Sequence, residues 1–226
     1  MKTITKIAHR KNILVILDAA QSAAHFPLNV KNLDIDFMAF SAHKMYGPFG
    51  VGVLFGKKKL LNKYMPSIIG GGSIQEVSKQ KFILNNLPNK FESGTPNIGG
   101  IIAFKKSLEF IEKIGFENIQ KHNQNITNSI SIKLKEIPKI KVLNSNSSNN
   151  NIILFNFDNI HAHDIENFLA KQNIYIRTGK HCANLIVQKI NHLSTIRISI
   201  GIYNNMEDVN ILIKNLKKIK NLLDII

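Results

Sequence analysis

Residues 41–52 have the sequence SAHKMYGPFGVG, in which Lys44 stands in a tight turn supported by glycines. The apolar runs on either side, residues 37–40 and 51–54, predict two strands joined by this turn. A third apolar, partly β-branched run at residues 13–17 favours a buried parallel strand whose last residue emerges at its carboxyl end. Strands with helical connections predict an α/β sheet, and ligands of such sheets bind where the strands end.

Lys44 is the residue of this turn with the most unusual chemistry. A lysine amine that is shielded from water loses its proton more easily and becomes a nucleophile toward carbonyl groups. Ser41 and His43 carry groups that bind phosphate, and the glycines allow the backbone to approach a flat ring closely. The alternative is a solvated surface lysine in an ordinary turn.

Asp18 follows the strand predicted at residues 13–17. A carboxylate at a strand end is the group that keeps a pyridine nitrogen protonated, and a protonated ring withdraws electrons. Gln21, three residues later, is placed to donate to a phenolic oxygen of such a ring. The alternatives are a helix cap for Asp18 and a surface amide for Gln21.

The second half of the chain predicts a different arrangement. Apolar residues recur at helical spacing over residues 99–135 and indicate two long helices broken near Gly115. Polar residues 144–151 predict a loop. We therefore expect three regions: a partial large domain over 1–98, linking helices over 99–143, and a small α/β domain over 144–226. In the small domain we expect strands at 152–157, 174–177 and 195–200, a helix opening near Asp164, and a final helix at 206–223.

The composition sets limits on the class of protein. The 226 residues include 30 Lys and Arg against 15 Asp and Glu, and the net charge is +15. The basic residues are scattered rather than gathered in one patch with aromatic residues, so nucleic-acid binding is not expected. There is no long apolar run and no apolar stretch of the signal-peptide kind near the first residues, so we expect a cytoplasmic protein.

Five ordered blocks together resemble the cysteine desulfurase and selenocysteine lyase family, whose members are fold-type I pyridoxal-phosphate enzymes. The similarity extends over essentially the whole chain, and the last block points to the subgroup that supplies iron–sulfur assembly through sulfur mobilisation. The blocks are DAAQ at residues 18–21, SAHK at 41–44 with its glycines, GGGS at 70–73, FESGTPN at 91–97 and RTGKHCA at 177–183.

The resemblance implies a role for each matching residue. It makes Lys44 the lysine that carries pyridoxal phosphate. The other implied roles are Asp18 at the pyridine nitrogen, Gln21 at the phenolic oxygen, Ser41 and His43 on the phosphate, Thr95 on the phosphate of a neighbouring subunit, and Arg177 and Arg197 around the substrate carboxylate. A guanidinium fork suits a carboxylate; the alternative for either arginine is a surface ion pair.

Cys182, the single cysteine of the chain, cannot form an internal disulfide and is either an inert apolar residue or a working thiol. The resemblance makes it the nucleophile that takes sulfur from cysteine as a persulfide and releases alanine. Lys180, His181 and Arg177 are expected to favour its thiolate.

Two further histidines, His161 and His163, invite a metal interpretation. Two ligands without further Cys or His at a suitable spacing make a weak zinc site. We therefore expect no metal, and we expect these histidines to face the pocket entrance or solvent.

The resemblance also implies that chains of this family begin well before the point that matches Met1. It therefore implies an α/β fold that corresponds to the C-terminal part of a fold-type I enzyme, with a partial mixed sheet from the large domain and a small C-terminal α/β domain. The sequence leaves open a fragment of a longer protein and a shortened gene product. Three hypotheses follow: a homodimeric cysteine desulfurase or selenocysteine lyase with a sulfur-acceptor partner, a cofactor-binding remnant without turnover, and a basic binding protein on a borrowed fold. A large-domain sheet without its other strands would expose an apolar edge and face.

Overall fold

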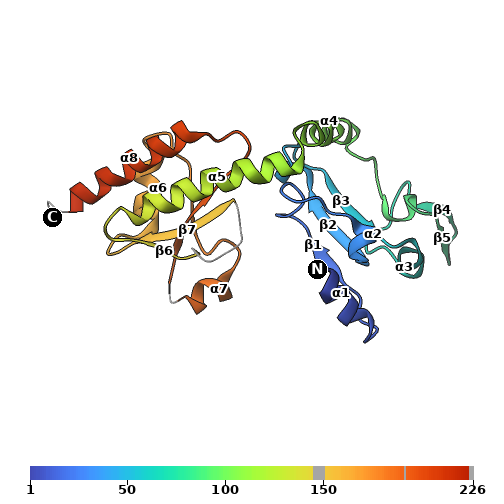
Figure 1. The fold of residues 1–226 in the computed structure, drawn as a ribbon. Helices are drawn as coiled ribbons and strands as arrows, with labels where there is room; N and C mark the ends of the chain where they lie inside the picture. Colours follow the sequence, from blue (N-terminus) through green and yellow to red (C-terminus); the bar gives the residue numbers. More distant parts are fainter. Residues whose placement is uncertain (145–150, 191, 224–226) are drawn as a thin grey trace. The chain divides into compact units, whose positions relative to one another are not determined.

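The computed structural model describes residues 1–144, 151–190 and 192–223 of the chain. The chain divides into two compact units, Met1–Phe116 and Glu117–Ile226 (Figure 1). The boundary lies inside the region in which linking helices are expected, so one long helix belongs to each unit.

The first unit is built on a three-stranded mixed sheet in the order β1-β2-β3. Strand β1 (Ile16–Asp18) runs parallel to β2 (Phe37–Ser41), and β2 runs antiparallel to β3 (Gly52–Gly56). This confirms the mixed sheet that the resemblance implied, although β1 begins three residues later than the apolar run that predicted it.

The expectation that the first strand is buried is wrong for this chain. Ile16 is 71% exposed and Leu54 is 57% exposed. The strand register places both side chains on the same face of the sheet, together with Ala39. The apolar run therefore marks a face that is open to solvent within this unit, as expected for a sheet without further strands.

Helices and a hairpin complete the first unit. The core is formed by apolar side chains, among them Ala19, Ile35, Met38, Ala42 and Phe104. The remaining elements are α1 (Lys2–His9), α2 (Val30–Leu33), the 3-10 turn η1 (Ala42–Lys44), α3 (Lys58–Lys63), the hairpin strands β4 (Ile74–Val77) and β5 (Phe82–Leu84), the 3-10 turn η2 (Asn89–Phe91) and α4 (Ile98–Ile114).

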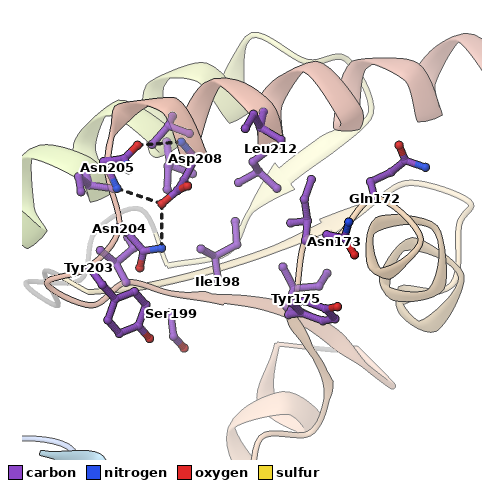
Figure 2. A pocket seen from close by; sticks show the side chains of 17 residues that line it. Gln172, Asn173, Tyr175, Ile198, Ser199, Tyr203, Asn204, Asn205, Asp208 and Leu212 are labelled. Atoms are coloured by element: carbon purple, nitrogen blue, oxygen red, sulfur yellow. Dashed lines mark hydrogen bonds between the residues drawn. The ribbon is translucent and has the colours of Figure 1, made fainter. Parts of the chain in front are cut away.

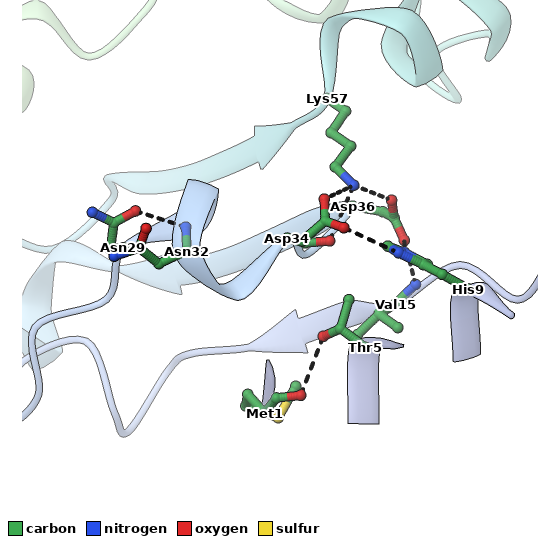
Figure 3. Close-up of polar contacts among 9 residues, drawn as sticks. All are labelled: Met1, Thr5, His9, Val15, Asn29, Asn32, Asp34, Asp36 and Lys57. Carbon is green, nitrogen blue, oxygen red and sulfur yellow. Dashed lines mark hydrogen bonds and ion pairs between the residues drawn. The ribbon is translucent and has the colours of Figure 1, made fainter. Parts of the chain in front are cut away.

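A cluster of charged side chains ties α1 to the sheet (Figure 3). Asp36 is only 3% exposed, and its Oδ2 accepts hydrogen bonds from the Val15 amide at 2.7 Å and from His9 Nε2 at 2.8 Å. Its Oδ1 lies 2.9 Å from Lys57 Nζ. Burial alone would raise the pKa of Asp36, but the hydrogen bonds from Val15, His9 and Lys57 lower it to about 2.

We expect Asp36→Ala to destabilise the first unit by about 3 kcal/mol, because it leaves the buried Val15 amide without its acceptor and removes one of the two carboxylates that pair with Lys57. The stabilisation from the Asp36 carboxylate is complete above its ordinary pKa of 3.8 and is lost as the pH falls toward 2. Urea unfolding at several pH values measures both effects. Asp34→Asn is the matched control, because the Asp34 side chain is 65% exposed and solvent screens its ion pairs. Equal losses for both variants would contradict the assignment.

The second unit is a four-stranded sheet, in the order β6-β7-β9-β8, whose neighbours are all antiparallel. Its core includes Phe155, Leu169, Ile196 and Leu216, each fully buried. The elements are α5 (Phe116–Lys135), β6 (Ile140–Val142), β7 (Ile152–Phe157), α6 (Ala162–Ala170), β8 (Arg177–Gly179), α7 (Asn184–Lys189), β9 (Thr195–Ser199) and α8 (Met206–Leu223).

Most expectations for this unit are confirmed. Gly115 breaks the two long helices with a φ of 82°, and the final helix has the predicted bounds. The strand expected at residues 174–177 instead occupies Arg177–Gly179. Residues 145–150 of the expected loop lie outside the described residues. No helix in the described part of the chain is both long and apolar enough to cross a membrane.

Candidate functional site

The turn that carries Lys44 begins where β2 ends. The amide of Ala42 donates to the Val51 carbonyl at 3.0 Å, and the Ala42 carbonyl accepts from Met45 and Gly47 at 2.8 and 3.0 Å. Ala42 is fully buried. This pattern closes one short turn, so Ser41, His43 and Lys44 are presented at the carboxyl end of β2.

Two glycines are required by the geometry of this turn. A Cβ on Gly47 would lie 2.8 Å from the Ala42 carbonyl oxygen and 2.8 Å from the Phe104 ring. Gly50 has a φ of +75°, which L side chains rarely adopt. The glycines therefore shape the backbone that holds Lys44.

Lys44 and His43 are both exposed. The His43 ring stacks on Phe49, with centroids 5.4 Å apart and planes inclined by 20°. Within the described residues, Lys44 Nζ makes no hydrogen bond or ion pair. Its amine is therefore available to a ligand, although the enclosure expected for it is not provided by this unit.

Asp18 lies at the neighbouring strand end. It is the last residue of β1, in register with Ala39 of β2, and its Oδ1 accepts a hydrogen bond from the Ala20 amide at 2.9 Å. Residues 20–25 form turns rather than a helix, so Asp18 caps a turn. The parallel pairing brings the carboxyl ends of β1 and β2 side by side, and Gln21 follows in the exposed turn.

Thr95 is exposed in the loop before α4. The loop is fixed at Gly94, whose amide donates to the Gly71 carbonyl at 2.7 Å. Asn97 accepts from the Gly100 amide at 3.0 Å and caps α4. The GGGS and FESGTPN blocks therefore form one substructure, and no contact joins Thr95 to Lys44 within the described residues.

In the second unit, Arg177, Cys182 and Arg197 lie close together. Arg177 of β8 is in direct register with Arg197 of β9. The Arg177 Nη2 lies 3.5 Å from the Cys182 sulfur and donates to it. Cys182 is exposed. The structure thus places a reachable thiol beside two guanidinium groups.

The electrostatics of this cluster favour an anionic ligand. Burial lowers the pKa of Arg197, and the nearby Arg177 lowers it further, while Cys182 opposes the change. The Nε of Arg197 is buried without a hydrogen-bond partner in the described structure. Within the described ranges, no carboxylate forms an ion pair with either arginine, so the surface ion pair considered for them is not found.

The rings of His161 and His163 are in tilted contact, with centroids 5.1 Å apart and planes inclined by 40°. His163 Nδ1 lies 2.7 Å from the Thr178 hydroxyl, which also donates to Glu166. The hydrogen bond from Thr178 and the neighbouring His163 lower the pKa of Glu166. These contacts attach α6 to β8. Among the described residues, no group of three or more His, Cys, Asp or Glu side chains is placed to hold a metal ion.

A cavity of about 560 Å³ lies elsewhere in the second unit, between the segment 172–176, the end of β9 and the start of α8. In Figure 2, Asp208 holds Asn204 and Asn205 through hydrogen bonds at its rim, and Tyr175 and Tyr203 lie nearby. None of the nine predicted site residues lines this cavity. Its shape therefore does not identify the reaction centre.

Each unit thus gathers its own part of the predicted site. The first unit brings together Asp18, Ser41, His43 and Lys44 at adjacent strand ends, with Gln21 and Thr95 on exposed loops. The second unit brings together the two arginines and Cys182. Sequence reasoning missed a contact of His181, whose Nε2 lies 2.9 Å from the hydroxyl of the buried Thr195. No local signal marks Thr195, because strand pairing alone brings it there.

Comparisons with known proteins identify the family of this chain. The model of the class-V aminotransferase family matches residues 1–212. The chain is 41% identical over 223 residues to a cysteine desulfurase of Wigglesworthia glossinidia brevipalpis, covering 98% of this chain and 54% of that protein. It is 37% identical to a probable cysteine desulfurase of Borreliella burgdorferi, covering 97% of this chain and 54% of that protein.

Solved structures give the same result. The crystal structure of the cysteine desulfurase CsdA from Escherichia coli superposes with a TM-score of 0.90 at 34% identity, covering 96% of this chain and 54% of that one. The apo cysteine desulfurase of Thermococcus onnurineus NA1 gives 0.91 at 33% identity, with coverage of 96% and 55%. The chain spans about half the length of the relatives it matches.

Proposed function

The chain belongs to the class-V aminotransferase family, and from this premise we propose that it is part of a pyridoxal-phosphate-dependent cysteine desulfurase. The reaction converts L-cysteine to L-alanine and leaves the sulfur as a persulfide on Cys182. One observation carries the proposal: an exposed thiol lies 3.5 Å from Arg177, which is paired with Arg197. The named relatives favour cysteine over selenocysteine as substrate.

The donor groups at the ends of β1 and β2 fit pyridoxal phosphate. Two adjacent strand ends carry the amine of Lys44, the carboxylate of Asp18, the hydroxyl of Ser41 and the imidazole of His43. The turn that holds Lys44 has no room for a side chain at Gly47. When bound, the cofactor supplies an electron-withdrawing ring that stabilises negative charge on the substrate carbons. In the proposed site, Lys44 holds the cofactor covalently, and Ser41 and His43 bind its phosphate. Thr95 from a second copy of the chain contacts the same phosphate.

Asp18 and Gln21 act on the ring in this proposal. Asp18, whose Oδ1 accepts from the Ala20 amide, would keep the ring nitrogen protonated. Gln21 donates its side-chain amide to the phenolic oxygen. The two residues flank one turn, so a single backbone segment sets both contacts.

The second unit supplies the groups that act on cysteine. Arg197 and Arg177 bind the substrate carboxylate, which neutralises two like charges that have no acidic partner in the described structure. The Cys182 thiolate attacks the substrate sulfur: a sulfur–sulfur bond forms, the carbon–sulfur bond breaks, and its electron pair stays on carbon. Protonation of that carbon gives alanine, so one cysteine and one thiol become one alanine and one persulfide.

The test is alanine formation from L-cysteine by a protein that contains residues 1–226, supplied with pyridoxal phosphate. Arg197→Gln is expected to lower kcat/KM by about 10- to 100-fold, mainly through KM, since it removes charge-assisted hydrogen bonds to the carboxylate. Lys171→Gln, which removes an exposed charge of the same unit outside the 177–183 block, serves as the control and stays within about threefold of the parent. Full cofactor binding without any alanine would contradict the proposed function, and an unchanged KM would contradict the role of Arg197.

The remaining assignments are also proposals. A homodimer is supported by exposed apolar residues at the start of α4, where Ile98 is 58% exposed and Ile102 is 63% exposed, next to Thr95. Exposure of Cys182 suits delivery of sulfur to an acceptor protein of iron–sulfur assembly. A cytoplasmic location stays a prediction.

A further inference from the structure

The turn that carries Cys182 has an unfavourable backbone conformation. The Ala183 amide donates to the Lys180 carbonyl at 2.8 Å and closes a four-residue turn. Its two central residues, His181 and Cys182, have φ values of 53° and 58°. Left-handed conformations at both central positions normally select Gly, Asn or Asp. Something other than local preference must therefore hold this turn.

The His181 side chain provides an anchor. Its Nε2 lies 3.1 Å from the Thr195 carbonyl oxygen and 2.9 Å from the Thr195 hydroxyl oxygen. A carbonyl oxygen can only accept, so Nε2 carries the proton and donates to both atoms. Thr195 is fully buried, and its hydroxyl donates to the Gly179 carbonyl at 3.4 Å. The imidazole therefore ties the turn to Thr195, the buried first residue of β9.

The surroundings of the His181 imidazole disfavour its charged form. Burial lowers the pKa of His181, and the charges of Arg197 and Arg177 lower it further against the opposing hydrogen bond to Thr195. The Nδ1 atom is buried and has no hydrogen-bond partner in the described structure. The lowered pKa of His181 therefore gives no support to the expectation that its charge favours the Cys182 thiolate.

We propose that His181, anchored by Thr195, is a positioning residue that holds the Cys182 turn in its left-handed conformation and so keeps the Cys182 sulfur beside Arg177. Released from the anchor, the turn adopts the ordinary right-handed conformation and carries the sulfur away from the guanidinium at 3.5 Å. The role of this sulfur position in catalysis rests on the proposed function. The role of His181 in holding the turn does not.

The test uses the rate of alkylation by iodoacetamide in the 226-residue chain, where Cys182 is the single cysteine. His181→Ala removes the anchor and still disfavours the left-handed turn, so the rate is expected to fall at least about threefold, because the guanidinium no longer favours the reacting thiolate. His181→Gly also removes the anchor but adopts left-handed φ unaided, so it should stay within about twofold of the parent. A normal rate in His181→Gly would show that the turn conformation matters and that the imidazole itself takes no direct part in the reaction.

Thr195 supplies an independent test. Thr195→Val removes the hydroxyl and should slow alkylation, whereas Thr195→Ser keeps it and should not. Arg177→Gln should slow the parent and the His181→Gly variant, but should add nothing to His181→Ala. Circular dichroism checks that each variant is folded. If Thr195→Val does not fold because Thr195 is buried, the His181 variants alone test the proposal, since His181 is partly exposed.

The proposal is overturned if His181→Gly is as slow as His181→Ala, or if His181→Ala reacts at the parental rate. Alkylation requires neither cofactor nor L-cysteine. Failure of the desulfurase assignment would therefore leave the alkylation result unaffected. Failure of the His181 proposal would likewise leave the desulfurase assignment standing.

Discussion

Lys44→Ala is expected to abolish covalent retention of pyridoxal phosphate and to reduce alanine formation from L-cysteine by about a thousandfold or more, the scale of loss seen when a covalent catalytic residue is removed. The physical reason is that Lys44 contributes the one amine of the turn formed by Ala42, Met45 and Gly47. The effect should be chemical rather than structural, since the exposed Lys44 side chain makes no hydrogen bond within the described residues.

Borohydride reduction followed by peptide mapping measures this directly. In the parent, the cofactor should be found on the peptide that contains Lys44, and the visible absorption band should be absent from Lys44→Ala. Lys59→Ala, which removes an exposed lysine of α3, is the matched control and should keep both band and label. Label on another lysine of the parent would refute the assignment.

Cys182→Ser is expected to keep the cofactor absorption band and to lose sulfur transfer from L-cysteine by about two orders of magnitude or more, because a serine hydroxyl is a far weaker nucleophile than a thiolate. Because Cys182 is the single cysteine, no other thiol of the chain can replace it. Release of selenium from selenocysteine should be less affected, because a carbon–selenium bond breaks more easily. Normal sulfur transfer by Cys182→Ser would contradict the desulfurase assignment, which requires the Cys182 thiol. The assignment of Lys44 as the cofactor-binding lysine would still stand.

Local patterns predicted the helices well. The end of α4 at Gly115 and the bounds of α8 follow from apolar spacing and from one glycine, which are properties of short segments. The strands were less predictable. Strand β8 begins at Arg177 because its pairing with β9 sets its extent, and pairing partners are not visible in a local pattern. The apolar residues of β1 indicated a strand correctly but could not show whether another element covers it, and Ile16 is exposed.

In the candidate site, too, some features follow from local sequence patterns and others depend on strand pairing. The parallel pairing of β1 with β2 brings Asp18 beside the Lys44 turn, as the predicted α/β sheet requires. The pairing of Arg177 with Arg197 and the contact of His181 with Thr195 depend on a strand register between residues 14 to 20 positions apart in the chain. Neither follows from residue type or spacing, so the anchoring role of His181 was accessible only from the structure.

The most direct test of the central claim is mass spectrometry of the Cys182 peptide after a short pulse of L-cysteine. The protein should contain residues 1–226 and carry bound pyridoxal phosphate. The account predicts that this peptide gains one sulfur atom, that alanine forms in equal amount, and that a thiol reductant removes the added sulfur. An unmodified Cys182 peptide in a sample that has formed alanine would contradict it.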